Sequence, residues 1–412
     1  MSNSSQFKIQ NSKFMIGEKV LCVRLDTIGD VLMTTPAIRA LKGSGAGQRR
    51  ITLLTSPAGA EVAGLVPEID EAIVYDAPWM KATAPRRDSQ PEYAMAERLR
   101  DEGFDAAVIF TVYSQSPLPS AFLCYLAGIP IRLAHCHENP YQLLTHWVPD
   151  PEPHTLIRHE VRRQLDLVAS VGCRARDERL SLRVPEAARS RVLDMLAQLQ
   201  LDLRRPWVVI HPGASAPSRR YPPESFAQAA RLLALEDGCQ VVFTGSEQES
   251  ELVESIRRAM GAPSHSLAGR LDLAELAALI SLAPVLISNN TGPVHVAAAL
   301  GTPVVDIYAL TNPQHTPWAV PNRVLNHDVP CKYCYKSVCP EGHHNCLRLV
   351  TPEAVAQAAR ELARWTMDNG RSVAGIGDRG SGIRPPADPI PTPASGYPRS
   401  PISDWTYPSS MM

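Results

Sequence analysis

Three loops in this sequence combine acidic, basic and small residues in a way that suits an anionic ligand. The first covers residues 24–30 (RLDTIGD) and ends with Asp30 at the start of an expected helix. A carboxylate at that position is favoured by the helix dipole, so Asp30 could simply cap the helix. If it faces a cleft, it could instead accept a proton from a sugar hydroxyl. With an ordinary pKa of about 3.9 it is a weak base unless burial raises that value.

The second loop covers residues 211–215 (HPGAS) and is followed by Arg219 and Arg220. Small residues such as Gly213, two positions after His211, let the backbone approach a ligand, and guanidinium groups match the geometry of phosphate oxygens. The alternative is an exposed loop with two solvated arginines. We favour ligand binding.

The third loop covers residues 288–295 (SNNTGPVH) and leads into another expected helix. Thr291 and Gly292 would leave free N–H groups at the helix start, and Pro293 suits the first helical turn. Such a terminus binds phosphate through its N–H groups and its dipole together, although Asn and Thr are also ordinary helix caps. Because the second and third loops both follow strands of the same half of the chain, they favour a diphosphate site.

Four of the nine cysteines are crowded into sixteen residues, with the spacing C-x2-C-x4-C-x6-C: Cys331, Cys334, Cys339 and Cys346. Two histidines, His343 and His344, lie inside this segment. The spacing is compatible with a structural zinc site, with a redox disulfide, or with free thiols that shape a loop. The other five cysteines are scattered singly, as buried thiols usually are.

The elements that must position these loops alternate between strand and helix, twice along the chain. One series begins with the strand at residues 19–25 and the helix at 31–41, and a second begins with the strand at 207–211. Such alternation predicts a parallel sheet with helices on both faces. We therefore expect an α/β fold with two Rossmann-like domains facing across a cleft. All three loops follow strands, at the sheet edge where such folds bind ligands.

The expected boundaries follow from composition. We expect disordered tails at residues 1–16 and, rich in proline, at 371–412. The first domain is expected at 17–200, including connecting helices, and the second at 201–350. A bracing helix is expected at 351–370, crossing back to the first domain.

Composition and missing motifs exclude several classes of function. The chain is 44% hydrophobic and 20% charged, which is typical of a folded protein, and its net charge of −1 gives no general attraction to nucleic acid. No GxGxxG follows a strand and no GxxxxGK[ST] occurs, which argues against dinucleotide oxidoreductases and P-loop enzymes. There is no apolar run of about 18–20 residues and no secretory signal, so we expect a cytoplasmic protein with at most peripheral membrane contact.

The chain resembles glycosyltransferase family 9, the ADP-heptose:lipopolysaccharide heptosyltransferases. The resemblance covers roughly residues 18–365 and rests on four segments in the family's order: RLDTIGDVLMTTPAIRALK, HPGASAPSRRYPPESF, FTGSEQE and ISNNTGPVHVAAALGTPVV. It implies the GT-B fold, with the acceptor bound by the first domain and the nucleotide sugar by the second. It also implies inverting transfer of a heptose from ADP-heptose to a lipopolysaccharide core or related glycan acceptor, with no cofactor required.

The resemblance further implies roles for individual residues. Asp30 matches the general base, and Arg219 stands where the family carries a basic residue near the donor phosphates. Glu247 matches a carboxylate near the ribose. In the third loop, Thr291 and Gly292 match the diphosphate-binding turn.

Two more residues of the third loop belong to the same donor-binding motif. His295 closes it. Asn290 departs from it, because the family usually has Asp there. An amide can still hydrogen-bond a sugar hydroxyl but lacks the negative charge, so the identity of the donor sugar stays open.

Two other functions remain alternatives at this point. One is a nucleotide-sugar epimerase on the same scaffold, which would act on the donor without an acceptor. The other is a non-catalytic sugar-nucleotide-binding protein, which the presence of Asp30 and Glu247 disfavours. The acceptor loops are expected at residues 111–119 and 133–145.

Overall fold

The computed structural model describes residues 16–44, 49–81 and 83–368, and these form two six-stranded sheets covered by helices. Except for Ile16, both expected tails lie outside the described residues. Within the described part of the chain, no helix combines the length and apolar character needed to cross a membrane.

The first sheet is entirely parallel and has the strand order β3-β2-β1-β4-β5-β6. Its strands are β1 (Lys19–Arg24), β2 (Arg50–Thr55), β3 (Glu71–Val74), β4 (Ala106–Ile109), β5 (Ile131–Cys136) and β6 (His146–Pro149). Its helices are α1 (Ile28–Gly43), α2 (Pro57–Ala63), α3 (Gln90–Glu102), α4 (Leu118–Leu126) and α5 (Glu160–Ala169).

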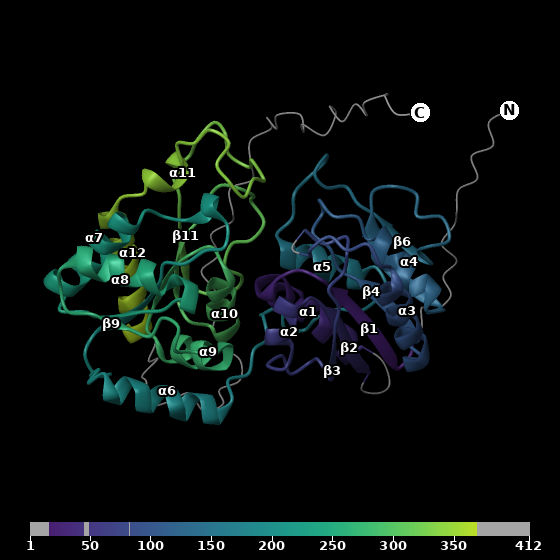
Figure 1. Ribbon diagram of the computed structural model, residues 1–412, viewed down its shortest axis with the longest axis horizontal. Helices are drawn as coiled ribbons and strands as arrows, with labels where there is room; N and C mark the ends of the chain where they lie inside the picture. Colours follow the sequence, from purple (N-terminus) through teal and green to yellow (C-terminus); the bar gives the residue numbers. More distant parts are fainter. Residues whose placement is uncertain (1–15, 45–48, 82, 369–412) are drawn as a thin grey trace. The chain divides into compact units, whose positions relative to one another are not determined.

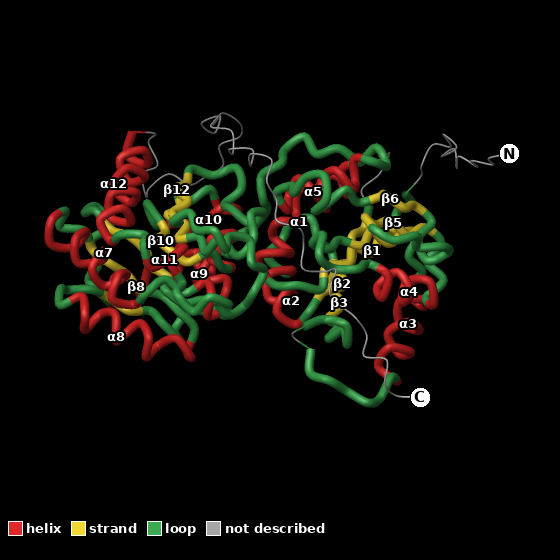
Figure 2. The backbone as a smooth tube through the Cα atoms, turned by 90° about the horizontal axis from the view of Figure 1, so that it is seen from above, coloured by secondary structure: helices red, strands yellow, loops and turns green. Residues whose placement is uncertain are grey.

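Strand β1 shows why this sheet needs helices on both faces. Val20 and Cys22 point to one face and belong to the core that contains α1 and α5. Leu21 and Val23 point to the other face and pack with residues of α3 and α4. Figures 1 and 2 show these two helix layers on either side of the strands. A strand buried on both faces reads as a continuous apolar run, and β1 has such a run, VLCV, between Lys19 and Arg24.

The second sheet is also parallel, with the order β12-β11-β10-β7-β8-β9. Its strands are β7 (Trp207–His211), β8 (Gln240–Phe243), β9 (His265–Ser266), β10 (Leu286–Asn289), β11 (Val304–Ile307) and β12 (Asn322–Leu325). The helices from here to the end of the described chain are α6 (Glu186–Gln198), η1 (Pro217–Arg219), α7 (Pro223–Glu236), η2 (Glu247–Glu249), α8 (Ser250–Met260), α9 (Leu273–Leu282), α10 (Gly292–Leu300), α11 (Asn345–Arg348) and α12 (Pro352–Asp368).

Both sheets have the 3-2-1-4-5-6 strand order of a Rossmann fold when strands are counted within each half. The direction in which successive strands are added to the sheet therefore reverses between β1 and β4 in the first half and between β7 and β10 in the second. Ligands of such sheets bind outside the carboxyl ends of the strands at that switch. The expectation of two Rossmann-like domains is confirmed, and the three chemically interesting loops follow β1, β7 and β10.

The expected bracing helix forms as α12, but its packing differs from the expectation. Its apolar face, with Val355, Ala358 and Leu362, is buried in the core that contains residues of α7 and β11. Helix α12 therefore braces the second half of the chain and does not cross back to the first domain.

Candidate functional site

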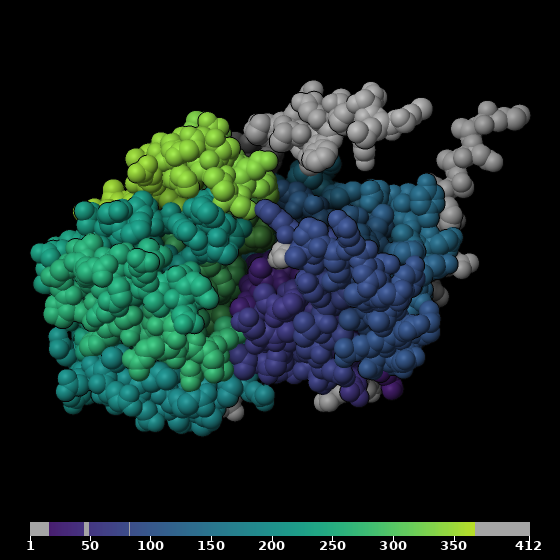
Figure 3. Space-filling view, in the orientation of Figure 1, coloured from purple at the N-terminus to yellow at the C-terminus, as the bar shows by residue number. Residues whose placement is uncertain are grey.

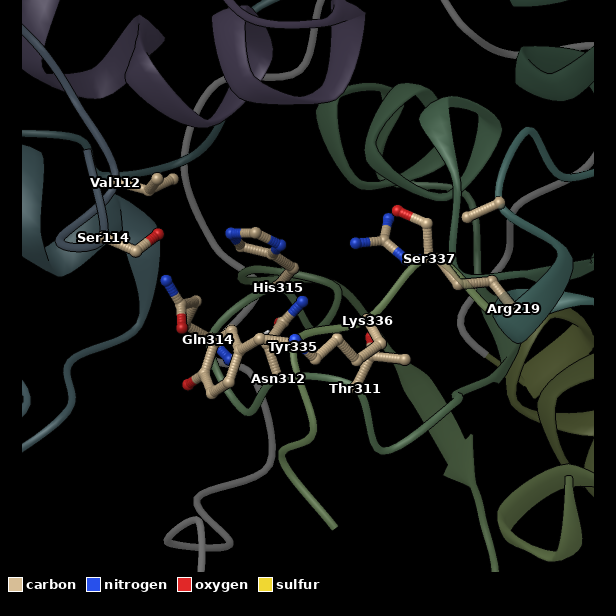
Figure 4. A pocket seen from close by; sticks show the side chains of 11 residues that line it. Val112, Ser114, Arg219, Thr311, Asn312, Gln314, His315, Tyr335, Lys336 and Ser337 are labelled. Carbon is tan, nitrogen blue, oxygen red and sulfur yellow. Dashed lines mark hydrogen bonds between the residues drawn. The ribbon is translucent and has the colours of Figure 1, made fainter. Parts of the chain in front are cut away.

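A cavity of about 190 Å³ is lined by loops from both halves of the chain. Val112 and Ser114, which follow β4, come from the first half, within the loop expected to bind the acceptor. The second half contributes Arg219, the loop after β11 and residues 335–337 (Figure 4). The second expected acceptor loop, residues 133–145, does not line this cavity.

The charged groups of this cavity are all basic. Arg219 and Lys336 line it, and no Asp or Glu is among its lining residues in the described chain. Figure 4 shows the Arg219 guanidinium and the His315 imidazole reaching toward each other. A cavity with two cations and no carboxylate suits an anionic ligand.

Arg24, at the end of β1, is fully buried and holds three carboxylates. Its Nε lies 3.0 Å from Asp26 Oδ2, its Nη2 lies 3.1 Å from Asp30 Oδ1, and its Nη1 lies 2.9 Å from Glu160 Oε1. The negative charges outnumber the single guanidinium. Burial raises the pKa of Asp26 and the pKa of Glu160, despite the opposing effect of Arg24.

Asp30 is both a helix-capping residue and a candidate base. It is the third residue of α1, and its Oδ2 accepts hydrogen bonds from the Thr27 N–H at 3.1 Å and the Thr27 hydroxyl at 2.8 Å. Burial alone would raise the pKa of Asp30. The charge of Arg24, with smaller contributions from His315 and from the Thr27 hydrogen bonds, outweighs burial and lowers this pKa to about 2. The side chain is 15% exposed. Because its pKa is about 2, Asp30 is ionised at neutral pH. Because its side chain is partly exposed, a hydroxyl group can reach it.

The N-termini of α1 and α10 are in direct contact. A Cβ on Gly29 would lie 2.6 Å from Cδ2 of His295, and a Cβ on Gly292 would lie 3.9 Å from Cγ2 of Ile28. The side chain of Thr291, the N-cap of α10, makes no capping hydrogen bond, Pro293 has no N–H, and the Val294 N–H donates to the Thr291 carbonyl, so the Gly292 N–H is the group of this turn that a ligand could accept from. Two positive helix ends at one place favour an anion there.

Asn290 uses both of its amide hydrogens within the protein. Its Nδ2 donates to Oδ2 of Asp306 at 2.9 Å and to the backbone carbonyl of His315 at 2.9 Å. Asp306 is fully buried in β11, and this burial raises its pKa well above the ordinary value. Neither Asp306 nor His315 was expected from the sequence as a partner of Asn290.

The turn after β7 packs against a carboxylate that sequence analysis did not single out. A Cβ on Gly213 would lie 2.0 Å from Oε1 of Glu249, so only glycine fits there unless Glu249 moves. Oε2 of Glu249 accepts from the Ser246 N–H at 2.8 Å and lies 3.9 Å from Nε2 of His211. Glu247, in contrast, is exposed. The motif FTGSEQE contains both glutamates, and only the fold separates their environments.

Three histidines interact electrostatically with one another, His159, His295 and His315, and the last two also interact with Asp30. Burial, opposed by Asp30, lowers the pKa of His295 to about 4 and that of His315 to about 3. Burial also lowers the pKa of His159 to about 4. All three are therefore neutral at pH 7. Sequence analysis identified only His295.

The four clustered cysteines surround a small cavity of about 20 Å³, together with His343 and His344. This segment is the yellow-green surface around α11 in Figure 3. Cys331 Sγ lies 3.6 Å from His343 Nε2, yet no group of three or more His, Cys, Asp or Glu in the described residues is arranged to hold a metal ion. All nine cysteines are free thiols. The structure thus supports neither the zinc site nor the disulfide.

Two Rossmann-like halves, with ligand loops at both switch points, define the GT-B class of glycosyltransferase fold. The sequence pattern of glycosyltransferase family 9 (heptosyltransferase) matches residues 93–345. The chain therefore belongs to that family and is a glycosyltransferase.

Similar proteins agree with this assignment over most of the chain. Lipopolysaccharide heptosyltransferase 2 of Escherichia coli K12 is 27% identical over 359 residues, covering 84% of this chain and 98% of that protein. The crystal structure of a family 9 glycosyltransferase from Veillonella parvula has a TM-score of 0.72 at 22% identity, covering 84% of this chain and 98% of that one. The structure of E. coli ADP-heptose LPS heptosyltransferase II has a TM-score of 0.66 at 25% identity, covering 85% and 99%.

Proposed function

We propose that this glycosyltransferase transfers a heptose from ADP-heptose, with inversion at the anomeric carbon, to a lipopolysaccharide core or a related glycan acceptor. The names of its relatives support this choice, since several are lipopolysaccharide or lipooligosaccharide heptosyltransferases. A similar structure, at 20% identity, is that of the E. coli heptosyltransferase WaaC with ADP-2-deoxy-2-fluoro heptose.

The contact between the start of α1 and the start of α10 carries the proposal. An inverting transfer needs a proton acceptor on one face of the anomeric carbon and a stabilised leaving group on the other. The contact between Gly29 and His295 brings Asp30, one residue further along α1, close to the free N-terminus of α10. The leaving diphosphate would bind that N-terminus, at Thr291 and Gly292, together with Arg219.

In the proposed reaction, the acceptor hydroxyl oxygen forms a bond to the anomeric carbon while the bond from that carbon to the diphosphate oxygen breaks. The electron pair leaves with ADP, and the hydroxyl proton passes to Asp30. Asp30, with a pKa of about 2, is a weak base for a free hydroxyl. The hydroxyl becomes strongly acidic once its oxygen is bonded to carbon, so the proton moves late in the reaction. Arg219 and the helix terminus would neutralise the leaving group without a metal ion.

The remaining expected donor contacts fit the nucleotide side of the site. His211 and Gly213 form the turn after β7, and Glu247 begins η2 after β8 with its side chain exposed. An exposed carboxylate could accept hydrogen bonds from ribose hydroxyls. The cavity of about 190 Å³ is smaller than the ~300 Å³ at the lower end for small-molecule sites. A nucleotide sugar would therefore require the flanking loops to open and close around it.

The test combines binding with turnover. ADP should raise the unfolding temperature of the protein more than UDP or GDP at equal concentration, because a ligand stabilises the state that binds it. With ADP-heptose and a core acceptor lacking that heptose, the protein should release ADP and form a glycoside of inverted configuration. Consumption of the donor without acceptor, giving an isomeric nucleotide sugar, would instead identify the epimerase alternative. Equal, negligible shifts with all three nucleotides would exclude a nucleotide-sugar enzyme.

A further inference from the structure

His315 reaches the cavity from a loop whose sequence gave no hint of function. It lies in the segment after β11, together with Thr311, Asn312 and Gln314 of the same cavity wall. Its ring extends toward the Arg219 guanidinium (Figure 4). His315 also interacts electrostatically with Asp30 and with Arg219, so it is close both to the proposed base and to the proposed diphosphate contact.

The ring of His315 has hydrogen-bonding capacity that the protein leaves unused. Its Nε2 is buried and has no hydrogen-bond partner. A buried polar atom without a partner is costly, and ligand sites are where such atoms are usually found. A neutral imidazole carries one donor and one acceptor nitrogen, which suits a sugar hydroxyl or a phosphate oxygen.

The backbone of His315 is held from two sides. Its carbonyl accepts a hydrogen bond from Asn290 Nδ2 at 2.9 Å, and its N–H donates to the Tyr308 hydroxyl at 3.3 Å. The same Asn290 nitrogen donates to Asp306 at 2.9 Å. Asn290 is 5% exposed, so these bonds are protected from water. Asn290 thus connects the diphosphate-binding turn to the loop that carries His315.

We propose that His315 is a donor-binding residue that contacts the sugar-diphosphate part of the nucleotide sugar, and that Asn290 is a positioning residue that holds His315 in place. This inference about His315 and Asn290 rests on the proposed function. It accounts for the departure of this chain from the family motif, because only an amide can serve both neighbours. An aspartate at position 290 would have no N–H for the His315 carbonyl, and it could pair with Asp306 only by sharing the proton that burial favours on that carboxyl.

The groups around His315 determine how it responds to a ligand. Asp30 comes from α1, His295 from α10, Arg219 from η1 and His159 from the start of α5. Among these, Arg219 carries positive charge and Asp30 negative charge, while both histidines are neutral. A bound diphosphate would add negative charge on the Arg219 side and strengthen any hydrogen bond that His315 donates.

The first experiment removes the imidazole. The variants His315→Ala and His315→Gln are compared with His154→Ala, an exposed histidine outside the cavity. We expect His315→Ala to raise the KM for ADP-heptose about 10-fold, the size of one hydrogen bond to a charged oxygen. His315→Gln, which keeps a donor and an acceptor, should recover part of this loss, and His154→Ala should match the parent.

The second experiment separates positioning from folding. Asn290→Asp should lower the unfolding temperature and raise the KM for the donor, because it places two carboxyl groups together in a buried site. The double variant Asn290→Asp/Asp306→Asn restores one amide–carboxylate pair, so its unfolding temperature should recover. Residue 290 would still lack a donor for the His315 carbonyl, so the KM should stay raised and kcat should change less than KM.

The outcomes distinguish this inference from the function on which it rests. If the parent neither binds ADP nor turns over ADP-heptose, both are overturned. If the parent is active and folded His315→Ala and His315→Gln both keep the parental KM, only the role of His315 is overturned. A double variant with the parental KM would show that Asn290 does not act by positioning His315. A raised KM in all of these variants except His154→Ala, with partial recovery in His315→Gln, supports the inference.

Discussion

Gly29, in the first turn of α1, lies against the ring of His295, in the first turn of α10. The two residues are 266 positions apart in the sequence. A methyl group on Gly29 would come within 2.6 Å of Cδ2 of His295, closer than van der Waals contact allows. This contact brings the first Rossmann-like half of the chain against the turn that begins α10 in the second half.

Gly29→Ala should therefore separate the starts of α1 and α10. We expect a loss of stability of about 1–3 kcal/mol from overpacking. We also expect at least a 10-fold loss of kcat/KM, because small displacements of reacting groups strongly reduce rates. Gly43→Ala, at the exposed end of the same helix with no atom within 4 Å of the new Cβ, is the matched control. Thermal unfolding and steady-state kinetics check the pair, and equal behaviour of the two variants would contradict a tight contact.

The variants Asp30→Asn and Asp26→Asn should differ sharply in kcat. Asp30→Asn removes the proposed proton acceptor and should lower kcat by about 10²–10⁴-fold. Asp26→Asn removes one of three carboxylates that compete for the single buried Arg24, and burial already raises the pKa of Asp26. Its kcat should fall by less than 10-fold. Rates measured at saturating donor and acceptor check this, and a more severe effect of Asp26→Asn would move the role of base to that residue.

The sequence was sufficient to predict the parts of the site that depend on local order along the chain. His211 ends one strand, and Asp30 and Thr291 follow two others, in an alternating strand–helix series, and a parallel sheet brings such positions to one edge.

Other parts depend on packing between distant segments and could not be predicted. Glu247 and Glu249 are two residues apart, and only the approach of Gly213 makes Glu249, and not Glu247, the partner of the turn. The position of His315 depends on Asn290 and Tyr308, which belong to other segments.

Neutral buried histidines should make the protein sensitive to mild acid. His159 has its pKa lowered by burial to about 4, against 6.5 for the free side chain. The unfolded chain therefore binds more protons than the folded chain between these values, so this contribution to stability is complete above pH 6.5 and is lost as the pH falls toward 4.

His159→Asn isolates one such group. His159 is the N-cap of α5, where its Nδ1 accepts from the Val161 N–H at 3.2 Å, and asparagine is also a good cap. Between pH 6.5 and pH 4 the unfolding free energy of the variant should vary with pH less steeply than that of the parent, by up to about 1.4 kcal/mol per pH unit. Urea unfolding at several pH values measures both slopes. Parallel curves for parent and variant would show that His159 is not held neutral.

Arg219 should contribute to the binding of a nucleoside diphosphate and much less to the binding of a monophosphate. It lines a cavity whose described lining has no carboxylate, whereas neighbouring Arg220 donates to the Ala214 carbonyl and does not line the cavity. Arg219→Ala should weaken ADP binding about 10- to 100-fold, the range for hydrogen bonds to charged groups, and AMP binding much less, because AMP lacks the second phosphate. Arg220→Ala should affect both ligands little. Calorimetric titration with ADP and AMP checks this. An equal loss for the two nucleotides would place Arg219 at the adenosine or first phosphate, away from the bond that is broken in the transfer.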